Sequence, residues 1–216
     1  MTTKLTEAYV FERLPLEPIP AGTNLLVTGP PHGRTQDLLY ELLAGGEGEG
    51  MLFVTTDDDG ITVAETYEGL GHTFDPGRMC LIDASQHGQD AEDAPIRHVG
   101  SPSDLTGIGM EFSSLYESLR GSGLAQIRVG LSSISTLLVY AEDFRAVYRF
   151  LHTITSRIRT AEGLGVFSVD PDAVEDEAFA TIAQTFDARL DVREDETGAE
   201  VRIRGLDDQP TGWQSL

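Results

Sequence analysis

A glycine-bracketed loop carries the residues of this chain that are best suited to chemistry. Residues 28–35 read Thr-Gly-Pro-Pro-His-Gly-Arg-Thr, between an apolar strand-like run and a helix-like run. Such a loop can bind phosphate, because its backbone N–H groups and the helix N-terminus attract an anion. In the full pattern G-x-x-x-x-G-K-[ST], the lysine reaches the β- and γ-phosphates and the hydroxyl binds magnesium. The predicted nucleotide-binding residues are Gly29, Gly33, Arg34 and Thr35, and Thr35 is the candidate metal ligand.

The loop departs from that pattern in two places. Only three residues separate Gly29 from Gly33, so fewer N–H donors can surround a phosphate, and Pro30 and Pro31 remove two donors. Arg34 replaces the lysine, and its planar guanidinium can pair with phosphate without matching a site shaped for an ammonium group. Three interpretations stay open: a structural turn that needs glycine, a nucleotide-binding loop, and a loop that also supports hydrolysis.

Hydrophobic periodicity predicts strands that alternate with helices along the chain. Buried strands are expected at residues 24–28, 51–55, 78–83, 127–131 and 165–169. Helices are expected after the first loop, at residues 62–70, 104–120 and 144–158, and from Asp170-Pro171 onward. The other segments are a long polar surface loop at 84–103 and a C-terminal hairpin formed by 189–193 and 200–204. This order predicts an α/β fold, with a mostly parallel central sheet that carries helices on both faces.

The charge balance of the chain is strongly acidic. Asp and Glu number 36 against 15 Lys and Arg, which gives a formal net charge of −21 and a pI of about 4.4. Lys4 is the only lysine. Hydrophobic residues still make up 40% of the chain, so we expect a folded protein adapted to very high salt rather than a disordered acidic chain. The lack of a basic stripe argues against a nucleic-acid partner.

The length of the chain and its single cysteine limit the number of domains and the compartments that we expect. The 216 residues suit one α/β domain, and no linker or repeat divides them, so a single domain over 1–216 is predicted. Cys80 is the only cysteine and lies in an apolar run, which predicts a buried, inert thiol in a reducing compartment. Neither a signal-peptide pattern nor an apolar run of membrane-spanning length is visible. These features predict a cytoplasmic protein without membrane contact.

With this order of motifs, the chain resembles the RecA/KaiC-like P-loop ATPases, specifically their small single-domain members from halophilic archaea. The resemblance covers most of the chain and rests on residues 25–35, 101–109, 128–138, 148–152 and 202–206. It implies a RecA-type core, in which helices flank a central parallel sheet that ends in a C-terminal hairpin. It also implies ATP and Mg²⁺ as possible ligands.

The family's site residues are only partly kept. In the family, the fourth strand ends in an aspartate that holds magnesium through water, and Ser132 stands at that position here. A neutral hydroxyl does not replace a carboxylate in that role. The family's catalytic carboxylate follows the second strand, which makes Asp57 and Asp58 the candidate general bases; a solvated acidic turn is the alternative. Arg202 and Arg204 match a basic pair that reaches a neighbouring subunit's nucleotide in oligomeric relatives, and they also suit plain surface charges.

Two function classes follow from these residues. The first is a catalytically degenerate RecA/KaiC-like protein that acts as a regulatory or protein-interaction module, through a protein partner or self-association. The alternative is an ATP-binding protein or ATPase that uses Arg34 and Thr35 in an atypical loop, with Asp57 or Asp58 as the base. Because the departures fall on the phosphate and magnesium chemistry, the sequence favours a protein without ATP turnover.

Overall fold

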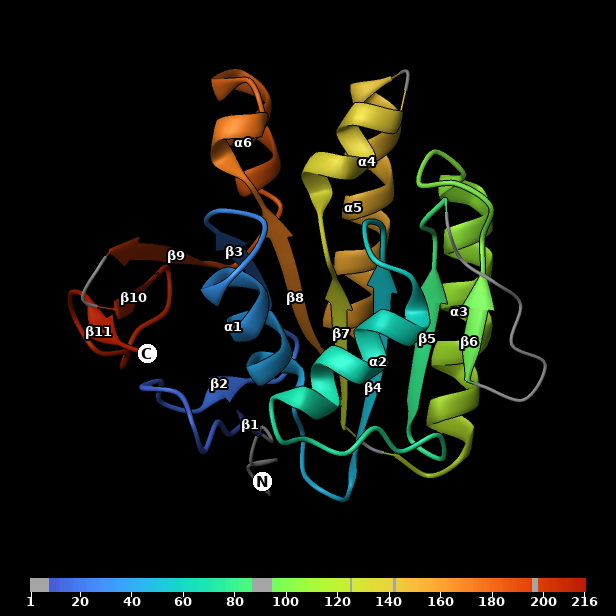
Figure 1. Ribbon diagram of the computed structural model, residues 1–216, viewed down its shortest axis with the longest axis horizontal. Helices are drawn as coiled ribbons and strands as arrows, with labels where there is room; N and C mark the ends of the chain where they lie inside the picture. Colours follow the sequence, from blue (N-terminus) through green and yellow to red (C-terminus); the bar gives the residue numbers. More distant parts are fainter. Residues whose placement is uncertain (1–7, 87–94, 125, 142, 196–197) are drawn as a thin grey trace, which may run out of the picture.

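The computed structural model describes residues 8–86, 95–124, 126–141, 143–195 and 198–216. A nine-stranded sheet runs through its centre (Figure 1). In chain order its strands are β3 (Asn24–Thr28), β4 (Glu49–Thr55), β5 (Met79–Asp83), β6 (Ile96–His98), β7 (Gln126–Leu131), β8 (Leu164–Val169), β9 (Ala188–Asp195), β10 (Gly198–Arg204) and β11 (Gln214–Ser215). A separate antiparallel pair is formed by β1 (Ala8–Tyr9) and β2 (Ile19–Pro20).

Most of the sheet is parallel. The order across it is β11-β10-β9-β3-β8-β7-β4-β5-β6. Every neighbouring pair from β9 to β6 is parallel, whereas β10 runs antiparallel to both β9 and β11. The predicted parallel sheet with a C-terminal hairpin is therefore confirmed. The carboxyl ends of β3, β4 and β7 meet at one edge, which is where ligands of parallel α/β sheets bind.

Helices cover both faces of the sheet, as predicted. They are α1 (Arg34–Leu43), α2 (Gly60–Gly69), α3 (Leu105–Gly121), α4 (Ile134–Tyr140), α5 (Phe144–Thr160) and α6 (Asp176–Ala183). Successive side chains of a strand point to opposite faces. Leu25 and Val27 of β3 accordingly belong to the core cluster that contains α1 and α2, and Leu26 belongs to the cluster that contains α3 and α5. Burial on both faces explains why these strands are continuous apolar runs.

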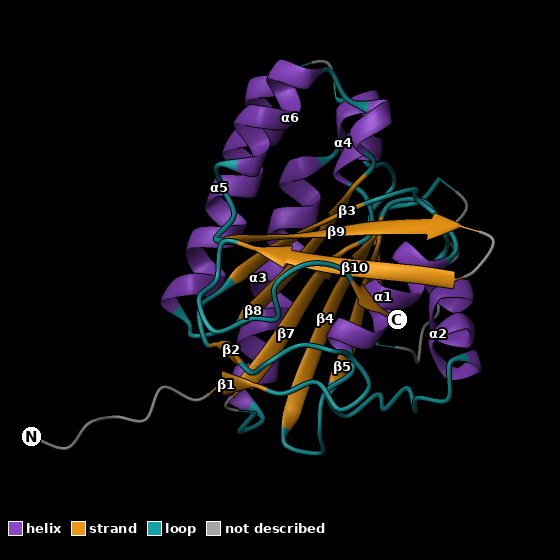
Figure 2. Cartoon of the chain, turned by 90° about the vertical axis from the view of Figure 1, so that its left-hand side faces the viewer, coloured by secondary structure: helices purple, strands orange, loops and turns teal. Residues whose placement is uncertain are grey.

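Two short helices stand above the carboxyl edge of the sheet (Figures 1 and 2). The α4 helix starts where the Ser133 side chain accepts a hydrogen bond from the Thr136 N–H at 3.0 Å. The helix predicted from Asp170-Pro171 begins later, because a 3₁₀ turn (Pro171–Ala173) comes first and α6 starts only at Asp176. Between them α4 and α6 leave a groove above the sheet, lined by residues of both.

Several short elements escaped the periodicity analysis, among them β6 and α4. The segment 84–103 was expected to be a surface loop, yet its last part contains β6, which pairs in parallel with β5; residues 87–94 lie outside the described part. The N–H of Leu81 donates to the carbonyl of Pro95 at 2.8 Å, and Ile96 packs against the core, so pairing and packing together fix this edge strand. The seven residues of α4 are likewise too few to display a helical repeat.

A buried arginine closes the opposite, amino end of the sheet. Arg128 of β7 is only 1% exposed, and its Nε lies 2.5 Å from a Glu49 carboxylate oxygen. Its other nitrogens donate to the carbonyls of Leu42 at 2.9 Å and Val10 at 3.0 Å, and its guanidinium lies 5.0 Å from the Phe11 ring centroid. Arg128 therefore ties the N-terminal segment to the sheet.

Among the described helices, none has the length and apolar character needed to cross a membrane.

Candidate functional site

The predicted phosphate loop joins β3 to α1 at the carboxyl edge of the sheet. Gly33 has a φ of +66°, in the left-handed region that favours glycine, and α1 begins at the next residue, Arg34. Gly29 packs closely against its surroundings. A Cβ added there would lie 2.6 Å from the Thr35 hydroxyl and 3.1 Å from the Val192 Cβ. Both glycines are thus required by backbone geometry and close packing alone.

A carboxylate from the C-terminal hairpin lies at the start of α1. The backbone N–H of Arg34 donates a hydrogen bond to Glu194 at 3.3 Å, and a Cβ added to Gly33 would meet the same carboxylate at 3.3 Å. The positive end of a helix is where a loop of this kind binds phosphate. Glu194 therefore places an anion of the protein itself at the position expected for a ligand.

The strand register explains how a residue so distant in sequence reaches the loop. Thr28, the last residue of β3, pairs with Asp191 of β9. The β9 strand continues beyond that pair, so Glu194 arrives beside the loop that follows β3. No local pattern around residues 29–35 indicates this contact. Only the correct placement of the hairpin next to the first strand of the core could have predicted it.

The Arg34 side chain points away from the loop that it was expected to complete. Its guanidinium is 61% exposed and pairs with the Asp37 carboxylate at 3.5 Å, one turn further along α1. A guanidinium held in solvent beside a carboxylate offers little positive charge to the loop. The role of Gly29, Gly33, Arg34 and Thr35 in binding a nucleotide stays a prediction.

The other candidate residues converge on one very small cavity. Thr35, Asp57, Asp58 and Ser132 all line a space of about 20 Å³. That volume suits about one water molecule, whereas ligand pockets have volumes of about 300–1,000 Å³. Within the described ranges, no group of three or more His, Cys, Asp or Glu side chains is placed to hold a metal ion. The role of Thr35 as a metal ligand stays a prediction.

Hydroxyl groups surround the Asp57 carboxylate. Ser132 and Thr136 both donate to it, Ser132 at 3.3 Å. The Ser132 hydroxyl also accepts from the backbone N–H of Thr56 at 2.9 Å and lies 3.0 Å from the Thr56 hydroxyl. The serine that replaces the family's aspartate thus connects the end of β4 to the end of β7. A carboxylate at this position would face Asp57 directly and would be repelled by it.

Asp58 is bound to α1 rather than directed at an open site. Gln36 donates to its carboxylate at 3.0 Å, and the Thr55 hydroxyl donates to its backbone carbonyl at 2.6 Å.

The neighbouring Tyr40 is 2% exposed. Burial, together with the negative charge of Asp58, raises the pKa of the Tyr40 hydroxyl to about 12, so Tyr40 keeps its proton at neutral pH. The cavity wall therefore has no phenolic group that can exchange a proton near neutral pH.

The predicted basic pair of the hairpin is occupied within the molecule. Arg202 lies 3.1 Å from the Asp191 carboxylate, Arg204 contacts the same carboxylate, and Arg189 lies 2.8 Å from it. The Thr28 hydroxyl donates to Asp191 at 2.9 Å. Burial acts to raise the pKa of Asp191, but the hydrogen bonds from Arg204, Thr28 and Arg202 outweigh it and hold that pKa below its ordinary value. Asp191 thus fixes the hairpin against β3 as a carboxylate.

Taken together, these contacts leave a small polar cavity at the carboxyl edge of the sheet, with room for about one water molecule. A phosphate at the start of α1 would have to displace Glu194, and its charge would lie near the carboxylates of Asp57 and Asp58. Cys80 is half-buried, and burial raises the pKa of its thiol, so it is not an activated nucleophile.

Comparisons with known proteins agree with this fold. One solved structure similar to this chain is the KaiC-like protein PH0186 from the hyperthermophilic archaeon Pyrococcus horikoshii OT3. The two share 17% sequence identity with a TM-score of 0.63, over 90% of this chain and 84% of that one. At this identity the likeness shows the fold alone, which is RecA-like. No curated protein matches the chain. The model of a family of unknown function, DUF7504, matches residues 22–192, and the chain therefore belongs to that family.

Proposed function

We propose that this chain is a RecA-like regulatory module that binds a protein partner and does not turn over ATP. The observation that carries the proposal is the Glu194 carboxylate, which accepts the Arg34 N–H at the start of α1. Because Glu194 supplies the negative charge at the start of α1, the loop between β3 and α1 does not need a bound phosphate at that position. The fold then persists without a nucleotide to hold the loop together.

The charges near the loop support the same conclusion. A triphosphate carries several negative charges, and the loop offers no lysine to balance them. Its one arginine pairs with Asp37 in solvent, while Glu194, Asp57 and Asp58 are all close to the path of an entering phosphate. Repulsion from these carboxylates adds to the cost of displacing Glu194. Nucleotide binding should therefore be weak even where the carboxylates are screened by salt.

Calorimetric titration in molar KCl tests this proposal. We expect no saturable heat with ATP–Mg²⁺ or ADP up to about 1 mM, which corresponds to a binding free energy weaker than about −4 kcal/mol. Phosphate release should stay at the background rate. Micromolar binding by the unmodified protein, or turnover that is abolished by Thr35→Ala, would show that the loop is a working nucleotide site.

One observation favours the alternative, an ATP-binding protein or ATPase. Thr35, Asp57 and Ser132 line one cavity, so the positions that hold magnesium and the catalytic carboxylate in RecA/KaiC-like ATPases lie together in this chain. Under this alternative Arg34 must leave Asp37 and supply most of the positive charge. Arg34→Ala would then weaken ATP binding by about 2–4 kcal/mol, because a charge-assisted phosphate contact is lost.

A further inference from the structure

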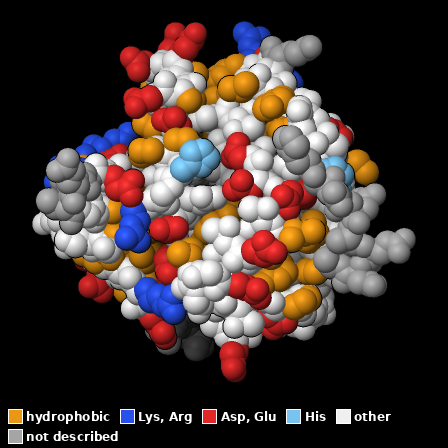
Figure 3. All heavy atoms as spheres, viewed as in Figure 1, with side chains coloured by type: hydrophobic (Ala, Val, Ile, Leu, Met, Phe, Trp, Pro, Cys, Tyr) orange, Lys and Arg blue, Asp and Glu red, His pale blue; other side chains and the backbone are white. Residues whose placement is uncertain are grey.

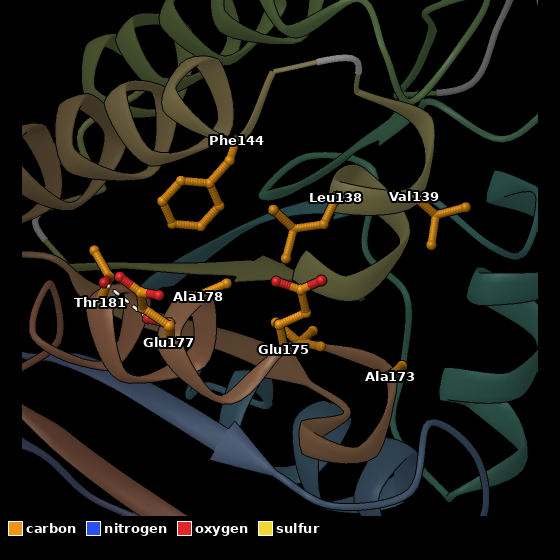
Figure 4. A pocket seen from close by; sticks show the side chains of 9 residues that line it. Leu138, Val139, Phe144, Ala173, Glu175, Glu177, Ala178 and Thr181 are labelled. Atoms are coloured by element: carbon orange, nitrogen blue, oxygen red, sulfur yellow. Dashed lines mark hydrogen bonds between the residues drawn. The ribbon is translucent and has the colours of Figure 1, made fainter.

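An open groove lies between α4 and α6, and none of its described lining residues is shared with the small cavity beside the phosphate loop (Figure 4). Its volume is about 430 Å³. Leu138 and Val139 of α4, Phe144 at the start of α5, and Ala178 of α6 supply apolar walls, and the close-up shows their side chains on opposite sides of the same space. A hollow of this size with apolar walls has the dimensions of a binding site rather than of a packing defect.

The α4 wall of the groove exposes large hydrophobic side chains to solvent. Val139 is 73% exposed, the highest value among the large hydrophobic side chains of the described residues, and its neighbour Tyr140 is 43% exposed. Figure 3 shows hydrophobic side chains gathered at the top of the molecule, between the positions of α6 and α4, with carboxylates beside them. Contiguous apolar surface next to a hollow typically marks an interaction site in a folded protein.

The rim of the groove is acidic. Glu175 and Glu177 line it, and none of the described residues that line it is Lys or Arg. Between Arg159 and Arg189 the sequence has no basic residue. The segment that leads into α6 carries Asp170, Asp172, Glu175, Asp176 and Glu177. An apolar partner that is seated here must therefore bring positive charge to the rim, and an acidic one would be repelled.

The backbone of the groove determines the form of that partner. Its walls come from α4, the start of α5, the end of the 3₁₀ turn with Val174, and α6, and none of the described lining residues lies in a strand that could pair with an extended peptide. An extended peptide would therefore bury N–H and C=O groups without partners. A helix brings its own backbone hydrogen bonds and can place apolar side chains into the groove.

We propose that the α4–α6 groove binds a basic amphipathic helix of a partner protein. Apolar side chains of that helix enter between Val139, Phe144 and Ala178, and lysines or arginines beside them meet Glu175 and Glu177. The inference rests on the proposed function, because it names the surface and the partner chemistry of the interaction module. A single helix in a groove of this size buries a small interface, so the complex is transient.

A synthetic peptide tests the groove directly. The probe is a fluorescein-labelled amphipathic peptide of about 18 residues, with leucines at helical spacing on one face and lysines on the other. Binding is followed by anisotropy at the lowest KCl concentration that keeps the native circular dichroism spectrum. We expect saturable binding, and an otherwise identical peptide with glutamates in place of lysines should bind at least about tenfold more weakly.

Variants of the protein separate specific docking from attraction to an acidic surface. Val139→Asp should weaken binding by about tenfold or more, since an apolar contact is lost. Attraction to negative charge alone predicts the opposite, because this change adds a carboxylate. Glu175→Gln with Glu177→Gln should weaken binding by about threefold, and less as KCl rises. The matched control Ile61→Asp alters a side chain of α2 that is 50% exposed, and it should change binding by less than about twofold.

The remaining outcomes overturn the proposal. Equal binding of the lysine and glutamate peptides would do so, as would equal losses in Val139→Asp and Ile61→Asp. Self-association of the protein that depends on Val139, without peptide binding, would assign the groove to a second copy instead. ATP titrations on the same samples keep the two proposals apart. If the peptide does not bind, the proposal that the chain binds no ATP is unaffected. If ATP binds, that proposal is wrong, whatever the result with the peptide.

Discussion

At the scale of single residues, Glu194 provides a carboxylate at the start of α1. A helix start carries about half a positive charge, and several of its N–H groups have no partner within the helix. In this chain the N-cap residue of α1 is Gly33, which has no side chain to cap those groups. Glu194 supplies the missing acceptor from β9. The contact places a negative charge at the positive end of α1, and under the proposed function it takes the place of a phosphate.

Neutralising this residue tests the contact. Glu194→Gln should lower the free energy of unfolding by about 0.3–1 kcal/mol, because a neutral amide interacts less with the helix start than a carboxylate does. Urea denaturation at several KCl concentrations measures the change, which should shrink as salt screens the charge. Glu65→Gln, an exposed carboxylate within α2, is the control and should have little effect. Equal losses in both variants would mean that Glu194 does not cap α1.

Asp191 is a second residue whose charge holds distant segments together. Three arginines and the Thr28 hydroxyl contact its carboxylate, so Asp191→Asn should lower the free energy of unfolding by about 1.5–3 kcal/mol. Because the folded-state pKa is below the ordinary value of about 3.9, this stabilisation is complete above pH 4 and is lost as pH falls through the folded pKa. Urea denaturation from pH 7 to pH 3 should show the two proteins converging at the acid end. A difference that persists unchanged at pH 3, or an equal effect of the exposed Asp207→Asn, would contradict this.

At the scale of elements, predictability followed length and periodicity. The α3 helix (Leu105–Gly121) lies close to its predicted range of 104–120, and the Asp104 side chain caps it by accepting from the Gly107 N–H at 2.8 Å. The β6 strand and α4 have too few residues to show a repeat, and pairing or capping fixes them instead. The candidate site divides in the same way. The order of residues in the loop was enough to predict that they lie between β3 and α1. Glu194 lies beside that loop only because β9 pairs with β3, which the local sequence does not indicate.

Ser132 joins two elements, and its removal should separate them. In Ser132→Ala, the buried N–H of Thr56 loses its acceptor and Asp57 loses a donor, so we expect a loss of about 1–3 kcal/mol in the free energy of unfolding. Urea denaturation measures it, with the exposed Ser114→Ala of α3 as the control. Ser132→Asp introduces the aspartate expected at this position in RecA/KaiC-like ATPases but sets it against Asp57, so it should destabilise the protein as well and produce no ATP turnover. A stable, ATP-hydrolysing Ser132→Asp protein would show that only one carboxylate separates this chain from an active enzyme.

At the scale of the whole molecule, the surface carries far more carboxylates than the basic residues can pair with. The chain has 36 Asp and Glu against 15 Lys and Arg. Many arginines are already committed to local partners, such as Arg159 with Asp187 at 2.8 Å and Arg193 with Glu200 at 2.5 Å. The rest of the acidic charge repels itself across a compact body. Such repulsion destabilises the folded state relative to an expanded one, in which the same charges lie farther apart.

Salt should therefore control whether the chain stays folded. The Debye length falls from about 10 Å at 0.1 M to about 3 Å at 1 M, so molar KCl removes most repulsion between neighbouring surface carboxylates. We expect the helical circular dichroism signal to decline on dialysis to low salt and to return when KCl is added back. Sucrose at the same osmolality is the control, because it favours compact states by exclusion from the protein surface and screens no charge. Recovery should be larger with KCl than with sucrose if screening is the cause. A native spectrum that is fully retained at low ionic strength would mean that α1, α3 and α5 pack tightly enough to hold a net charge of −21 without help from the solvent.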